Sequence, residues 1–246
     1  MTTRIRAVQK ADKTINAIVA AALTVILLFA FYCIWDTWQL MNGGASGSDL
    51  THYKPKPGEA THQSLADLKA RNEDVCAWLT IDNTGIDYPV LQGKDNFEYL
   101  TQDTFGNYSM LGSLFLDYRC DPTFESCYAL IHGHHMAESK MFGDLDKFED
   151  KNFFENNKTG YLMTVDKTYE LEIFACLHIE ATDPYVYSTY KISEVSNRAL
   201  LEHINEAALY QRDIGIKSTD KIIAMSTCAS GQTSDRTVVF ARMIQK

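Results

Sequence analysis

Three side chains with complementary chemistry stand at or beside the ends of predicted strands, far apart in the chain. They are His134, Cys228 and Arg236. A thiolate can attack a carbonyl carbon, an imidazole can carry the proton of a leaving group, and a guanidinium can stabilise a developing oxyanion. If the fold brings the three to one rim, they can perform a cysteine-dependent acyl transfer.

The spacing of Cys228 and Arg236 favours such a meeting. Cys228 ends one predicted strand and Arg236 opens the next, with seven residues between them. If these strands are antiparallel neighbours, a hairpin loop joins them and both residues lie at the same end of the sheet. Each residue type alone is weak evidence, because a lone cysteine is more often a small buried hydrophobe and an arginine at a strand end is commonly an exposed charge.

The elements that must position these residues are mostly short strands. Alternating patterns between turn residues predict eight of them, over residues 75–81, 86–91, 112–119, 127–132, 161–165, 169–180, 221–227 and 236–244. Helices are predicted over 64–71, 140–150 and 193–212, with a short one capped by Asp95. Gly133 is predicted to form a turn before His134. The sequence thus predicts a mainly β fold, a closed or nearly closed eight-stranded β-barrel with N-terminal and inserted α-helices, preceded by one transmembrane helix.

The N-terminal region predicts a membrane anchor. Residues 15–35 are almost wholly apolar, and as a helix they would measure about 31 Å, close to the ~30 Å of a hydrocarbon core. Four basic residues precede them, so the positive-inside rule predicts a cytoplasmic N-terminus. A cleaved signal peptide is the alternative, although its apolar stretch is normally shorter. We expect a cytoplasmic segment over 1–14, a transmembrane signal-anchor helix over 15–35, a linker over 36–63 and an extracellular catalytic domain over 64–246.

Composition and charge exclude several classes of protein. The chain has 246 residues, 46% of them hydrophobic, with 23 basic and 32 acidic side chains and five prolines. These values do not fit an intrinsically disordered or collagen-like chain. Residues 39–246 carry 19 basic and 30 acidic side chains, a net charge of −11. Because a phosphate backbone requires positive charge, we expect no nucleic-acid partner.

Several motifs resemble those of sortases. The cysteine segment resembles the Thr-Leu-x-Thr-Cys…Arg signature of that family; it reads Ile-Ala-Met-Ser-Thr-Cys over 223–228, followed by Asp-Arg-Thr-Val-Val over 235–239. Other segments are similar to class B sortases: Trp-Leu-Thr-Ile over 78–81, Ile-Asp-Tyr-Pro-Val over 86–90, Gln-Gly-Lys-Asp-Asn over 92–96, Gly-Ser-Leu-Phe-Leu-Asp-Tyr-Arg over 112–119, Gly-His-His-Met over 133–136 and Met-Phe-Gly-Asp-Leu over 141–145. The resemblance covers roughly residues 72–244, in the right order.

This resemblance implies a membrane-anchored cysteine transpeptidase at a Gram-positive cell surface, without a cofactor or metal. Cys228 would attack a threonine carbonyl in the C-terminal sorting motif of a secreted protein and form a thioacyl-enzyme. An amine of a cell-wall peptidoglycan precursor would then resolve this intermediate. His134 would act as general acid and then as general base, and Arg236 would hydrogen-bond the oxyanion. The lipid bilayer is the remaining expected partner, through residues 15–35.

The same resemblance implies a peptide groove lined by Asn96, Leu100, Ser226 and Thr227, with a lid formed by residues 182–190 and the helix after them. The sequence departs from the family pattern at two places. Residues 224–225 are Ala-Met where the signature has Thr-Leu, and His132 stands where the family usually has an aromatic or other hydrophobic residue. Neither departure touches the three predicted catalytic positions.

Two alternative functions stay open. With water in place of the amine, the same residues would make a membrane-tethered cysteine endopeptidase. A non-catalytic extracellular binding module would need none of them. The sequence also leaves open which sorting motif and acceptor amine are used, and whether the role is general anchoring, a dedicated substrate or pilus assembly.

Two alternative local chemistries also remain. The histidines of the segment 132–135 could be read as metal ligands together with Cys228, but His134 and His135 oppose each other on a strand and no carboxylate lies at a familiar ligand spacing. Cys120 and Cys127 could form a disulfide across a hairpin loop, because the domain is predicted to lie outside the membrane.

Overall fold

The structure is a computed structural model that describes residues 2–43, 50–56, 58–59, 61–137, 139–188, 193–228 and 235–246. For residues 2–8, 11, 39–43, 194–196 and 228 it describes the backbone alone. The chain divides into two compact units, Met1–Gly43 and Gly44–Lys246. The two are described separately below.

The first unit is a single helix, α1 (Thr2–Gly43). Its segment Asp12–Trp38 is long and apolar enough to cross a membrane, and none of it is buried. A signal sequence would pass the same test of length and composition. The helix continues over residues 36–43, which we had predicted as the start of a linker, because no glycine or proline interrupts the sequence before Gly43.

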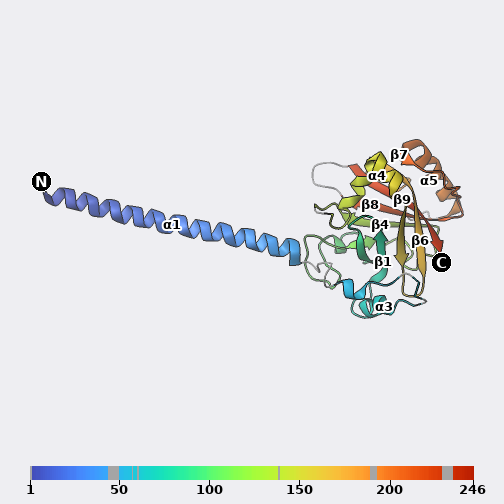
Figure 1. The fold of residues 1–246 in the computed structure, drawn as a ribbon, viewed down its shortest axis with the longest axis horizontal. Coiled ribbons are helices and arrows are strands. Elements are labelled where there is room, and N and C mark those ends of the chain that lie inside the picture. Colours follow the sequence, from blue (N-terminus) through green and yellow to red (C-terminus); the bar gives the residue numbers. More distant parts are fainter. Residues whose placement is uncertain are drawn as a thin grey trace. The chain divides into compact units, whose positions relative to one another are not determined.

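The second unit is built around a closed β-barrel (Figure 1). Eight strands follow one another around it in the order β5-β1-β2-β3-β4-β8-β9-β6, and β5 pairs with β6 to close it. The strands are β1 (Val75–Ile81), β2 (Asp87–Leu91), β3 (Leu114–Leu116), β4 (Tyr128–His134), β5 (Thr159–Met163), β6 (Thr168–Glu180), β8 (Lys221–Cys228) and β9 (Asp235–Gln245). The predicted eight-stranded barrel is therefore confirmed.

A ninth strand, β7 (Ala208–Gln211), extends one edge of this sheet. The long strand β6 pairs with β5 through residues 168–172 and with β7 through residues 175–177, so β7 continues the edge that β5 leaves. The sequence predicted one helix over 193–212, but α5 (Glu194–Ala207) ends before β7 begins. Pairing with the open edge of β6 outweighs the helical pattern of the last five residues.

Strands β4, β8 and β9 carry the predicted chemistry and lie side by side (Figure 1). β4 and β8 are parallel over seven register pairs, and β8 and β9 are antiparallel as predicted. β4 extends two residues beyond its predicted end, so Gly133 forms no turn. A Cβ at Gly133 would lie 2.4 Å from Leu114 and 2.7 Å from Phe142, so glycine serves here for close packing.

Short helices precede the first strand and lie in the connections between later ones. They are η1 (Thr51–Tyr53), α3 (Gln63–Lys69), η2 (Glu98–Leu100), η3 (Gly143–Glu149) and α4 (Lys151–Asn156). Asp95 was predicted to cap η2; the N-cap position is Phe97, and Asp95 accepts hydrogen bonds from the backbone N–H groups of Phe97 and Glu98 at 2.9 and 3.0 Å, at the start of the helix. The helix predicted over 140–150 is the 3₁₀ helix η3.

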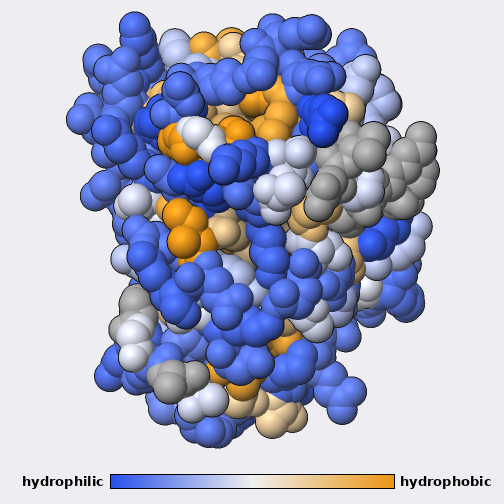
Figure 2. Space-filling view, turned by 90° about the vertical axis from the view of Figure 1, so that its right-hand side faces the viewer, coloured by the Kyte–Doolittle hydropathy of each residue, from blue (hydrophilic) through white to orange (hydrophobic). Residues whose placement is uncertain are grey.

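The apolar strand residues form the core of the barrel. Fully buried aromatic rings include Trp78, Phe115, Phe142, Phe174 and Phe240. The face at the right of Figure 1 is largely hydrophilic and carries only small, separate hydrophobic patches (Figure 2). The barrel is thus a packed scaffold, which can hold side chains rigidly at its rim.

Candidate active site

His134 and Cys228 are direct neighbours across the parallel pair β4–β8. They form its last register pair, after His132↔Ser226 and Gly133↔Thr227. The side chain of Cys228 lies outside the described part of the chain, so the finding concerns the two backbones. Adjacent strands are spaced ~4.8 Å apart, which brings the two residues to one rim of the barrel.

The imidazole of His134 is oriented by a backbone carbonyl. Its Nε2 lies 2.7 Å from the carbonyl oxygen of Leu100, at the end of η2. A carbonyl only accepts, so in the neutral ring Nε2 carries the hydrogen and Nδ1 holds the lone pair. The contact therefore selects the tautomer whose Nδ1 can take a proton.

Arg236 brings an unpaired donor to the same rim. Its backbone pairs with Ile179 of β6, on the far side of β9 from β8. The Nη1 atom is buried and has no hydrogen-bond partner among the described residues. An unsatisfied buried donor destabilises a fold by ~1–3 kcal/mol, so such a group calls for a functional explanation.

His134 and Arg236 line one open groove of about 500 Å³. That volume can accommodate several residues of an extended peptide. The other lining residues are Asn96, Phe97, Leu100, Phe115, His132, Ala181, Tyr187 and Thr227. Asn96, Leu100 and Thr227, three of the residues predicted to bind the peptide, line this groove, and their contact with a peptide stays a prediction.

Ser226, the fourth predicted groove residue, does not line the groove. It is fully buried, and its Oγ lies 2.9 Å from the hydroxyl of Tyr187. Tyr187 belongs to the segment predicted as a lid, of which residues 182–188 are described and 189–192 lie outside the described residues. Ser226 therefore supports the groove indirectly, through its hydrogen bond to Tyr187, which lines it.

A buried carboxylate organises the groove floor. Asp117 is 0% exposed and accepts hydrogen bonds from Arg119 Nε at 2.8 Å, Arg119 Nη2 at 2.7 Å and Asn96 Nδ2 at 2.8 Å. Nε2 of His132 lies 3.3 Å from the same carboxylate. Burial alone would raise the pKa of Asp117, but the bonds from Arg119, His132 and Asn96 outweigh it and hold the pKa well below its usual value. Asp117 is therefore ionised.

Three residues of the groove and its floor were not predicted from the sequence, namely Asp117, Phe97 and Phe115, whereas Tyr187 lies in the segment predicted as a lid. Asp117 follows the apolar run Leu114–Leu116, where a carboxylate at the end of a buried strand was a usable signal. For Phe97, which is 75% exposed at the groove, we find no comparable signal in the sequence.

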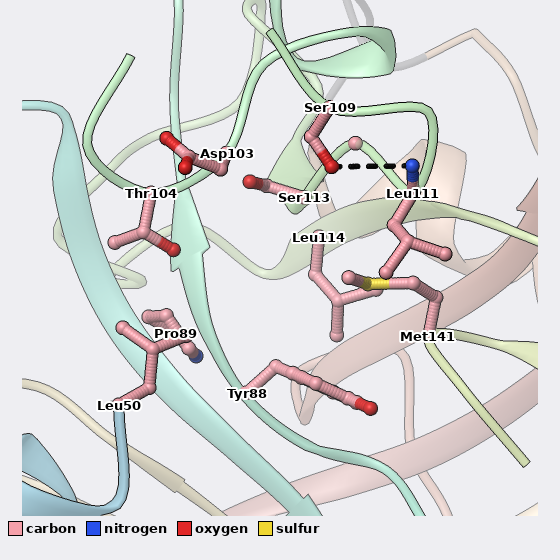
Figure 3. A pocket seen from close by; sticks show the side chains of 11 residues that line it. Leu50, Tyr88, Pro89, Asp103, Thr104, Ser109, Leu111, Ser113, Leu114 and Met141 are labelled. Carbon is pink, nitrogen blue, oxygen red and sulfur yellow. Dashed lines mark hydrogen bonds between the residues drawn. The ribbon is translucent and has the colours of Figure 1, made fainter. Parts of the chain in front are cut away.

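A second cavity lies away from this groove, between β2 and the loop before β3 (Figure 3). Tyr88, Leu111, Leu114 and Met141 line it, among others, and Ser109 Oγ accepts a hydrogen bond from the backbone N–H of Leu111 at 3.2 Å. Its volume is about 10 Å³, room for about one water molecule. It is too small to bind a peptide.

Among the described residues, the histidines of the metal alternative have separate partners, and Cys120 of the disulfide alternative is a free thiol. The three neighbouring imidazoles contact different partners: His132 contacts Asp117, His134 contacts Leu100, and His135 Nε2 contacts Asp146 at 2.7 Å. Cys120 is a buried free thiol, which excludes its predicted bridge to Cys127 in this structure.

Comparisons with known proteins agree with the geometry. A family model described as the sortase domain matches residues 79–244. A relative from Listeria monocytogenes named sortase B is 34% identical over 185 residues, which cover 74% of each chain.

Solved structures agree at the level of the fold. A Streptococcus pyogenes class B sortase involved in pilus biogenesis superposes with a TM-score of 0.66 at 39% identity, over 73% of this chain and 97% of the other. A Staphylococcus aureus sortase B–substrate complex gives a TM-score of 0.70 at 26% identity, over 76% and 87%. The matched region contains the groove and all three predicted catalytic positions.

Proposed function

Because this chain belongs to the sortase family of cysteine transpeptidases, and to its class B, we propose that it cleaves a C-terminal sorting motif of secreted proteins and transfers them to a cell-wall amine. The observation that carries this proposal is the backbone pairing of His134 with Cys228 at the end of two parallel strands, with Arg236 on the same groove and its Nη1 lacking a hydrogen-bond partner among the described residues.

Cys228 is the nucleophile of this reaction. Its sulfur forms a bond to the carbonyl carbon of the motif's threonine and gives a tetrahedral oxyanion. This intermediate collapses by breaking the C–N bond, which leaves a thioester on the enzyme and releases the C-terminal fragment as an amine. The attacking amine of the acceptor then breaks the C–S bond and restores the thiol.

His134 moves the protons in both halves. Protonated at Nδ1, it delivers a proton to the departing amine; neutral at Nδ1, it removes one from the incoming amine. The hydrogen bond of Nε2 to Leu100 supports this role, because it leaves Nδ1 as the nitrogen that exchanges protons.

Arg236 stabilises the oxyanion of both tetrahedral intermediates. The absence of a partner for Nη1 among the described residues supports this role, because an acceptor from the substrate would satisfy the donor. The groove residues Asn96, Leu100 and Thr227 contact the peptide N-terminal to the scissile bond.

Helix α1 anchors the enzyme in the membrane, with the N-terminus in the cytoplasm and the catalytic unit at the cell surface. The apolar segment Asp12–Trp38 and the four basic residues Arg4, Arg6, Lys10 and Lys13 support this orientation. Tethering places the active site where secreted precursors and cell-wall precursors are both present.

A peptide-library assay tests the proposal. The full chain in detergent is incubated with a library of short motif peptides, with and without added amines, and Cys228→Ala serves as the blank. We expect cleavage by the wild-type chain and a ligated product when an amine is present. Hydrolysis alone with every amine would favour the endopeptidase, and no Cys228-dependent cleavage would contradict an enzymatic function in peptide transfer.

A further inference from the structure

The floor of the groove holds a second imidazole that the proposed reaction does not use. His132 precedes His134 by two residues on β4, and alternate residues of a strand share a face. Both line the groove. The ring of His132 lies between those of Phe115 and Tyr187, with centroid distances of 5.3 and 6.3 Å.

Asp117 fixes the tautomer of His132. The carboxylate is ionised, as argued above, so it can only accept a hydrogen bond. Nε2 of His132 must therefore donate to it across 3.3 Å. Nδ1 has no hydrogen-bond partner among the described residues, and it is not one of their buried polar atoms that lack a partner. It is therefore accessible to a ligand in the groove.

This arrangement gives Nδ1 a polarity that depends on protonation. In the neutral ring Nδ1 presents a lone pair and accepts a hydrogen bond; in the imidazolium it donates one and the ring carries a charge. Among the described side chains, the charged and titratable groups around it are the ion pair Asp117–Arg119, His134 on the same strand, Tyr187 beside the ring and Arg236, which lines the same groove; the backbone of Cys228 lies opposite His134 on β8.

We propose that His132 is a specificity-determining residue, an inference that rests on the proposed function. Nδ1 of neutral His132 accepts a hydrogen bond from a donor side chain of the bound peptide, such as an amide. It disfavours the isosteric carboxylate, because the lone pair of Nδ1 then faces the lone pairs of a carboxylate oxygen. Protonated His132 donates to that carboxylate and attracts its charge. The selectivity of the groove between an amide and a carboxylate at this subsite therefore changes with pH.

Matched peptide pairs test this inference. In the best peptide cleaved by the full chain in detergent, each position N-terminal to the scissile threonine carries glutamine or glutamate in turn. The ratio of kcat/KM for the two peptides is measured from pH 5.5 to 8.5, where the glutamate stays ionised. Ionisations of the free enzyme that affect both peptides alike, such as those of His134 and Cys228, cancel in this ratio.

The control variant is His132→Phe, which keeps an aromatic ring between Phe115 and Tyr187 and leaves Arg119 and Asn96 on Asp117. At one position, we expect the wild-type Gln/Glu ratio to fall by about fivefold from pH 8.5 to 5.5, the effect of one hydrogen bond, and the variant's ratio to stay within about twofold. The same fall in the variant, or a constant wild-type ratio at every position, would overturn the inference.

A second measurement needs no turnover. The ¹⁵N chemical shifts of histidine-labelled protein report which nitrogen of His132 is protonated, with His132→Phe identifying its signals. We expect the Nε2-protonated tautomer at pH 8.5, and the Nδ1-protonated tautomer would overturn the inference. If the chain cleaves no peptide, that result counts against the proposed function. The NMR measurement still tests whether Nε2 of His132 donates to Asp117, because it does not depend on turnover.

Discussion

Thr227 Oγ1 accepts a hydrogen bond of 3.1 Å from the backbone N–H of Thr237. The bond lies beyond the last backbone register pair of β8 and β9, Ser226↔Val238, and both threonines are buried. It thus links the two strands one residue before Cys228 and one residue after Arg236. The side chain of Thr227 thus joins the strand ends that carry the proposed nucleophile, Cys228, and the proposed oxyanion donor, Arg236.

Replacing Thr227 with valine should damage both activity and stability. Valine keeps the shape but leaves the buried N–H of Thr237 without its acceptor, which costs about 1–3 kcal/mol in the free energy of unfolding. We expect kcat/KM to fall about tenfold because Cys228 and Arg236 lose their alignment. Peptide kinetics and urea unfolding measure both effects. Thr61→Val, at an exposed threonine, is the control, and unchanged kinetics in Thr227→Val would contradict this positioning role.

Arg236→Lys tests the oxyanion role. Lysine keeps the charge but not the planar fork of donors, so it cannot reproduce the hydrogen bonds of the guanidinium. We expect kcat to fall by about 10²-fold with little change in KM, as for the loss of a transition-state donor. The same exchange at exposed Arg198 should leave both constants unchanged. A change confined to KM would show that Arg236 binds the substrate in its ground state only.

Asp117→Asn should remove a pH-dependent part of the stability. The folded pKa of Asp117 lies below its usual value of 3.8, so its contribution is fully present above that pH and is lost as the pH falls below it. The variant also leaves Arg119 without its counter-charge, and we expect about 3 kcal/mol of destabilisation at pH 7.

The measurement is the free energy of unfolding at pH 7 and pH 3. The difference between the wild type and Asp117→Asn should shrink at pH 3, because Asp117 of the unfolded wild-type chain then binds a proton while the folded chain keeps the carboxylate ionised, which lowers the wild-type free energy of unfolding. Glu155→Gln, at an exposed helix carboxylate, should show no such change. An equal difference at both pH values would contradict the ionised state of Asp117.

Three other cysteines should be inert towards thiol reagents. Burial raises the pKa of Cys76, Cys120 and Cys176 to about 12, so they stay protonated at neutral pH. We expect peptide mapping after brief treatment with a methanethiosulfonate reagent at pH 7 to find them unmodified in the folded protein and modified after unfolding. Rapid labelling of any of the three without unfolding would contradict their burial.

Most of the barrel could be predicted because its signals are local. Apolar residues between turn residues predicted β1 over 75–81, the bounds that the structure has. β7 could not be predicted in this way, because residues 208–211 continue the helical pattern of α5 and become a strand only where β6 offers an open edge. The turn predicted at Gly133 was wrong for a similar reason, since glycine is required there by Leu114 and Phe142, which pack against it.

The site could be predicted only in part. A hairpin argument placed Cys228 near Arg236 from spacing alone, but the parallel pairing of β4 with β8 joins segments distant in the chain, and no local pattern encodes it. The resemblance to a family predicted catalytic roles for His134, Cys228 and Arg236, and these roles stay predictions. It did not identify the network of Asp117, because hydrogen bonds of a buried carboxylate depend on neighbours that only the folded chain supplies.

Intact-mass analysis of the enzyme during turnover tests the central claim most directly. The full chain is mixed, without an amine, with a motif peptide that it cleaves. The reaction is then quenched with acid and the protein is digested to locate the added mass. We predict a mass increase equal to the N-terminal peptide fragment less one water, as a thioester requires. The added mass should be located on Cys228, absent from Cys228→Ala and discharged when an amine is added before the quench. An acyl group on another residue, or cleavage that persists in Cys228→Ala, would contradict the account.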